Sequence, residues 1–119
     1  MTISELQKVV HEQAVERGLY KGKPSVSNLL WHVREEAAEA IKAWHDYKDL
    51  DVHNECDGVT SYCIKRDFQC KTCPRRRPEG VCMELADVVI MTLSLCEHLG
   101  INLEAAIEEK MAYNAIRKR

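Results

Sequence analysis

Apolar residues recur every three or four positions in four segments of the 119-residue chain, a spacing that gathers them on one face of a helix. The first segment follows Thr2, which with Glu5 fits a helix-capping pair, and it ends at Gly18. The second begins after Ser25 or Ser27 and continues to about residue 50. The apolar stripes are Leu6, Val9, Val10 and Ala14 in the first segment, and Val26, Leu29, Leu30, Val33, Ala37, Ala40, Ile41 and Trp44 in the second.

Two further helices are expected in the C-terminal part of the chain. The third runs from about Gly80 to Leu99 and ends at Gly100. Apolar residues occur on nearly every side of it, which is typical of a buried helix. Asn102 can cap a fourth helix that reaches the C-terminus. Because strand signals are weak everywhere, the pattern predicts an all-α fold in one domain over residues 1–119.

Residues 51–79 interrupt the helical periodicity, and we interpret them as an irregular cysteine-rich insertion between the second and third helices. The insertion holds four of the six cysteines and two of the three prolines. The pair Cys70 and Cys73 has the spacing of half a tetrathiolate zinc site, which would be structural. The alternative is an irregular loop with free thiols. The expected Zn²⁺ ligands are Cys56, Cys63, Cys70 and Cys73, with Cys82 competing for the fourth position and His53 as an outside candidate.

Bulk composition limits the partners of the protein. The formal net charge is only −2, so electrostatics gives no reason to expect binding to nucleic acid or to a membrane surface. Apolar residues make up 45% of the chain, which is enough to form a core. The longest apolar run, residues 88–91, is too short to span a bilayer. The N-terminal residues lack the basic and apolar regions of a signal peptide. These features predict a cytoplasmic protein.

Five carboxylates in two clusters are the most informative feature. On the second expected helix, Glu35, Glu36 and Glu39 fall within an arc of about 100°. On the third, Glu84 and Asp87 lie about 60° apart, and no Lys or Arg accompanies them. Buried carboxylates are costly unless a cation or proton neutralises them. The two clusters therefore predict an oxygen-rich site for a divalent cation such as Mg²⁺, whereas a solvated face is the alternative for the first three.

Polar residues of two helices are candidates for contacts with a nucleotide. Lys110, Asn114 and Arg117 share one face of the fourth helix with apolar residues, where they would continue a core-facing stripe. The two cations can bind phosphate oxygens, and the amide can bind a sugar or base. The alternative is a frayed, solvated C-terminal turn, which applies more to Arg117 than to Lys110. Trp31 can stack on a base or lie in a protein interface.

The acidic residues resemble the EExxE…ExxD signature of the MazG-like all-α nucleoside triphosphate pyrophosphohydrolases. The similarity covers roughly residues 3–48 and 77–117, and the cysteine-rich insertion is longer than usual for the family. It implies a four-helix MazG-like bundle that is completed by oligomerisation, as a homodimer or homotetramer. Similar flanks are Gly18-Leu19-Tyr20, Arg77-Pro78-Glu79-Gly80-Val81, Gly100-Ile101-Asn102-Leu103-Glu104 and Lys110-Met111-x-Tyr113-Asn114.

This resemblance also implies a reaction and its residues. The expected activity is Mg²⁺- or Mn²⁺-dependent hydrolysis of a canonical or non-canonical nucleoside triphosphate to the monophosphate and pyrophosphate. Lys110 and Asn114 correspond to family residues near the nucleotide, and Glu35 is a ligand or a neighbouring base. The implied metal ligands are Glu36, Glu39, Glu84 and Asp87.

The alternative function is a zinc-stapled module that binds nucleic acid or a protein without catalysis. Residues 65–77 carry six basic side chains against a single acidic one, Asp67. Such a patch is typical of nucleic-acid contacts, but it also suits a solvated rim or phosphate contacts near an active site. The near-neutral net charge counts against nucleic acid as the partner.

Overall fold

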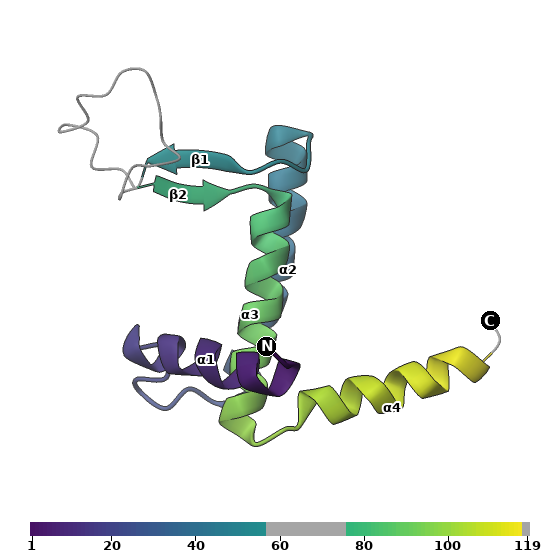
Figure 1. Cartoon of the computed structure of the whole chain (residues 1–119). Helices are drawn as coiled ribbons and strands as arrows, with labels where there is room; N and C mark the ends of the chain where they lie inside the picture. The colour runs from purple at the N-terminus through teal and green to yellow at the C-terminus, as the bar shows by residue number, and fades with distance from the viewer. Residues whose placement is uncertain (57–75, 118–119) are drawn as a thin grey trace. The chain divides into compact units, whose positions relative to one another are not determined.

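A computed structural model describes residues 1–56 and 76–117, and these ranges contain four helices and one two-stranded ribbon (Figure 1). The expectation of a mostly helical fold is confirmed for the described residues. None of the described helices is long and apolar enough to cross a membrane. The elements are α1 (Ile3–Glu16), α2 (Val26–Tyr47), β1 (His53–Cys56), β2 (Arg76–Glu79), α3 (Val81–Leu99) and α4 (Leu103–Ile116).

Three helices begin at the polar residues that the sequence indicates. The side-chain oxygens of Thr2, Ser25 and Asn102 accept hydrogen bonds from the backbone N–H three residues further on, each at 3.1 Å. These bonds satisfy donors that have no partner inside the helix. The second helix ends at Tyr47, earlier than expected. Lys48 adopts a left-handed conformation (φ +57°), which stops the helix and turns the chain toward β1.

The ends of the region expected to be irregular form an antiparallel ribbon. His53 pairs with Glu79, and Glu55 pairs with Arg77. Neither strand has the apolar alternation that predicts a strand, and Pro78 argues against one. A ribbon of only two strands tolerates proline because each strand has an unpaired edge. The expectation of a wholly irregular insertion is therefore wrong at both ends, and residues 57–75 lie outside the described ranges.

Contacts divide the chain into two compact units, Met1–Arg34 with Val89–Arg119, and Glu35–Val88. The core of the first unit is formed by Leu29, Met91 and Leu95, against which Leu19, Tyr20 and Val33 pack. The fully buried Leu29 comes from α2, whereas Met91 and Leu95 lie on one face of α3. This unit thus joins the N-terminal part of α2 to the C-terminal part of α3.

A polar network holds the loop after α1 in the first unit. Ser94 is buried on α3, and its Oγ lies 2.6 Å from the Tyr20 hydroxyl and 3.1 Å from His11 Nδ1. The Tyr20 ring also stacks on His98, with 4.3 Å between the centroids. The buried hydroxyl of Ser94 is therefore satisfied within the unit, as burial of a polar group requires.

The prediction that α3 is buried on all sides is wrong for the single chain. Met91, Leu93, Leu95 and Cys96 are buried, so the thiol of Cys96 belongs to the core. By contrast, the apolar residues Leu85, Val89 and Ile90 are exposed. Periodicity indicates which residues favour burial, but it does not show whether the chain has enough elements to cover them.

The fourth helix differs from expectation in the same way. None of its residues is buried in the single chain. Lys110 and Asn114 are exposed and Arg117 is partly exposed, so they do not continue a core-facing stripe here. Neighbouring Met111 and Ile116 are exposed as well.

In the second unit, Gly80 makes the connection between β2 and α3. Its φ of +113° lies in the region that only glycine adopts readily. A Cβ atom at this position would stand 2.3 Å from the carbonyl oxygen of Asp51. The close approach fixes the segment before β1 against the segment after β2, at the point where α3 begins.

We expect Gly80→Ala to lower the free energy of unfolding by about 2 kcal/mol or more, because it adds a backbone clash to an unfavourable φ. Gly22→Ala is the matched control, since Gly22 also has a positive φ (+78°), but a Cβ added there would meet no atom within 4 Å. Urea unfolding of both variants measures the difference. Equal losses would contradict a role for the Asp51 contact.

Candidate functional site

Three of the predicted carboxylates come together in the second unit. Glu36 and Glu39 lie on α2 and Glu84 lies in the first turn of α3. One carboxylate oxygen from each is within 4.8 Å of the others. The two acidic helix faces therefore meet, as the periodicity of both helices suggested.

Glu84 is the buried member of this group. Only 6% of its surface is exposed, and its Oε2 atom has no hydrogen-bond partner among the described residues. Burial raises the pKa of Glu84 to about 8, and a hydrogen bond with Glu79 and the nearby charges of Glu79, Glu39 and Asp87 act in the same direction. Without a cation, this carboxyl group thus holds its proton near neutral pH.

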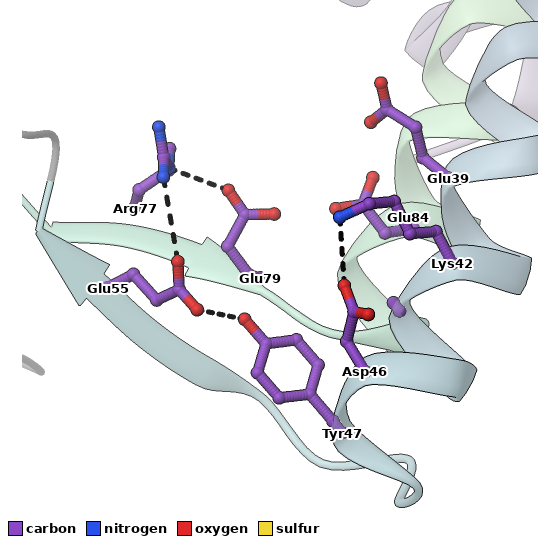
Figure 2. A pocket seen from close by; sticks show the side chains of 9 residues that line it. Glu39, Lys42, Asp46, Tyr47, Glu55, Arg77, Glu79 and Glu84 are labelled. Carbon is purple, nitrogen blue, oxygen red and sulfur yellow. Dashed lines mark hydrogen bonds and ion pairs between the residues drawn. The ribbon is translucent and has the colours of Figure 1, made fainter.

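The carboxylates Glu39 and Glu84 line a pocket of about 380 Å³ in the same unit. Figure 2 shows that side chains from α2, the ribbon and α3 all reach it. It is lined by five carboxyl groups and two cations, so its field is negative at neutral pH even when Glu84 is protonated. The lining residues are Glu39, Lys42, Ala43, Asp46, Tyr47, Glu55, Arg77, Glu79 and Glu84.

The ribbon supplies one of the two cations. Arg77 Nε lies 2.8 Å from Glu79 Oε1, and its Nη2 lies 3.6 Å from Glu55 Oε2. The hydroxyl of Tyr47 donates a hydrogen bond to Glu55. This bond is the main cause that raises the pKa of Tyr47 to about 12, because ionisation of the phenol would lose it.

Aromatic stacking fixes the start of the ribbon to the end of α2. The rings of Tyr47 and His53 lie nearly parallel, with centroids 3.8 Å apart. His53 Nε2 is 2.7 Å from Asp49 Oδ1, and this hydrogen bond lowers the pKa of the Asp49 carboxyl group. His53, an outside candidate for a zinc ligand, thus contacts Tyr47 at the end of α2 and Asp49 just after it.

The predicted zinc ligands fall mostly outside the described ranges. Cys63, Cys70 and Cys73 all do, so the zinc site stays a prediction. Cys56 is the last residue of β1, opposite Arg76. Cys82 lies in the first turn of α3, partly buried and outside any disulfide.

The other two predicted carboxylates, Glu35 and Asp87, lie outside the group of Glu36, Glu39 and Glu84. Asp87 is exposed on α3 and does not belong to the group of three, although its charge helps to raise the pKa of Glu84. Glu35 is exposed on α2, next to Glu36. Both residues make interactions of their own, so neither is without a partner.

The predicted nucleotide contacts belong to the first unit. Lys110 Nζ and Arg117 Cζ lie 5.3 and 5.6 Å from the centre of the Tyr113 ring. The exposed Trp31 has the guanidinium of Arg34 over its ring at 4.7 Å. Asn114 is exposed on the same helix as Lys110. Their roles toward a nucleotide stay predictions.

Several pocket residues were missed by sequence reasoning. Lys42 and Asp46 continue the face of Glu39 at intervals of three and four residues, which is a signal that periodicity contains. Glu79 comes directly before Gly80, where α3 begins. It lies in a segment that carried the family resemblance, and this was the signal that could have identified it. Glu55 gave no local signal, because only the pairing of the ribbon brings it to the pocket. Arg77 belongs to the basic stretch of residues 65–77 and to a flank of the family resemblance, but neither signal placed it beside Glu55 and Glu79.

Comparisons of this chain with known protein families, with characterised proteins and with solved structures find no match.

The raised pKa of Glu84 predicts a pH-dependent stability in the absence of divalent cations. The unfolded chain releases this proton near pH 4.5 and the folded chain near pH 8. The free energy of unfolding should therefore be highest below this range, fall as the pH rises through it, and become constant above it. Glu84→Gln, which resembles the protonated acid, should remove this part of the fall.

Chemical unfolding at several pH values in a chelating buffer measures this effect as the difference between wild type and variant. Glu12→Gln is the control, since Glu12 is an exposed glutamate of α1. Parallel pH profiles for the wild type and Glu84→Gln would show that the buried carboxyl group does not titrate as described.

Proposed function

We propose that this protein is a Mg²⁺-dependent nucleoside triphosphate pyrophosphohydrolase of the MazG-like type. The observation that supports the proposal most is the environment of Glu84. A buried carboxylate with an unpartnered oxygen, grouped with two more carboxylates, is costly unless something positive joins it. A divalent cation satisfies all three groups at once.

The donor set fits a hard cation. Glu36, Glu39 and Glu84 offer only oxygen atoms, and Mg²⁺ and Mn²⁺ prefer carboxylate and water oxygens. Glu39 is exposed, which leaves room for a substrate on its side of the group. A bound cation would offset the charge of phosphate oxygens and lower the pKa of a water molecule.

In the proposed reaction, water attacks a phosphorus atom of the triphosphate, and a phosphoanhydride bond breaks to give the monophosphate and pyrophosphate. Glu36, Glu39 and Glu84 would hold the cation, which would orient the phosphates when bound. The proton of the attacking water passes to a carboxylate, for which Glu35 is the family-implied candidate. Asp87 is proposed as a further ligand, and Lys110 and Asn114 as contacts of the nucleotide.

The proposal predicts that Glu39→Gln and Glu84→Gln each lower hydrolysis by at least about 100-fold, because each removes a charged oxygen from the cation site. The measurement is release of monophosphate and pyrophosphate from a panel of ribo-, deoxyribo- and modified triphosphates, with and without Mg²⁺. Glu12→Gln should hydrolyse like the wild type. Full activity in both site variants would overturn the assignment, as would the absence of turnover across the panel.

We also propose that the chain works as a homodimer or homotetramer. Large apolar side chains are exposed within each unit, including Leu30 and Val89 in the first and Ile41, Trp44 and Leu85 in the second. Exposed apolar groups in such number favour an interface with another copy of the chain. Light scattering during size exclusion should give two or four times the chain mass. A monomer at micromolar concentration would refute this.

A further inference from the structure

The ribbon brings a cation to a pocket whose other charged side chains are mostly carboxylates. Arg77 and Lys42 are the two cations among the lining residues. They differ in how they are held. Lys42 is 77% exposed and pairs with Asp46 on the next turn of the same helix, which is an ordinary solvated pair. Arg77 is held by two carboxylates of the ribbon.

These two ion pairs orient the guanidinium of Arg77. Its Nε faces Glu79 and its Nη2 faces Glu55, so two of its three nitrogen atoms are directed toward carboxylates. The side chain is nevertheless 56% exposed. An arginine has five N–H donors, so the oriented group retains donors for a further anion. A planar fork of this kind matches the oxygens of a phosphate group.

The position of Arg77 is linked to the carboxylates of the helices. Glu79 bonds to Arg77 on one side and to Glu84 on the other, and Figure 2 shows it between them. The stacking of His53 on Tyr47 and the close packing of Gly80 on Asp51 hold both strands at the helix ends. An anion bound at the carboxylate site through a cation would thus meet Arg77 in a defined place.

We propose that Arg77 binds phosphate oxygens of the substrate and so acts as a substrate-binding residue supplied by the ribbon. This inference rests on the proposed function, since it needs a phosphate chain at the Glu36, Glu39 and Glu84 site. A triphosphate carries more negative charge than one divalent cation offsets. On the ribbon side of the pocket, the guanidinium offers its remaining N–H donors to these phosphate oxygens.

The neighbouring Arg76 provides a matched control. It lies on the same strand, is exposed and donates from Nη1 to Asn54 Oδ1 at 2.9 Å. It does not line the pocket. Successive residues of a strand point to opposite faces, so Arg76→Gln removes the same charge from the ribbon without removing the proposed contact.

The test is the affinity of the protein for inorganic pyrophosphate in the presence of Mg²⁺, measured by calorimetry. Arg77→Gln should raise the dissociation constant by about 10- to 100-fold, as expected for loss of a charged hydrogen-bond pair. Arg77→Lys should recover part of the affinity, and Arg76→Gln should change it by less than about 3-fold. The KM of any hydrolysed triphosphate should follow the same order.

Binding of Mn²⁺ alone separates a phosphate contact from an indirect effect on the cation site. Arg77→Gln should bind Mn²⁺ at least as tightly as the wild type, because it leaves Glu79 without its positive partner. If Mn²⁺ affinity falls by the same factor as pyrophosphate affinity, Arg77 acts through the carboxylates and the inference is wrong.

The remaining outcomes distinguish the inference from the proposed function. Hydrolysis with the same KM in wild type, Arg76→Gln and Arg77→Gln would overturn the role of Arg77 and leave the proposed function standing. Pyrophosphate binding that depends on Arg77, without turnover of any triphosphate, would support the role and overturn the proposed function. Failure of the wild type to bind pyrophosphate at millimolar concentration would overturn the role of Arg77.

Discussion

The cost of burying a carboxylate is the constraint on which the second unit depends. Glu84 lies in the first turn of α3 with one oxygen unpartnered, and the neighbouring charges that raise its pKa are those of further acids. A fold that served only stability would place an apolar residue there. The neighbouring residues adapt the chain to this buried acid. Glu79 is hydrogen-bonded to Glu84, and Arg77 forms an ion pair with Glu79. Gly80 has the backbone conformation that lets α3 begin beside them.

The helices and the meeting of their acidic faces could be predicted because their signals are local. A capping oxygen and its donor are three residues apart, and the spacing of Glu36 and Glu39 places both on one face. The absence of Lys and Arg from α3 then indicated that its acids need another partner. Such arguments require only the geometry of a single helix and the sign of its charges.

The ribbon could not be predicted in this way, since its contacts join residues distant in sequence. Glu55 meets Arg77 only after β1 and β2 have paired, and the strands carry polar residues that give no alternation. The exposed side chains of α3 show a second limit. Apolar content indicated burial for Leu85 and Val89, but the single chain does not cover them. Whether the cysteines bind zinc depends on residues outside the described ranges.

The register of the ribbon has a consequence for how this protein can change in evolution. Cys56 stands opposite Arg76, so the chain leaves β1 and enters β2 at neighbouring points. A segment joined at two adjacent points can be lengthened, shortened or replaced at a small cost in loop-closure entropy. The stacking, the ion pairs and the glycine contact that shape the pocket all lie on the helix side of that junction. The fold therefore offers a place where new sequence can be accepted while the carboxylate pocket stays intact.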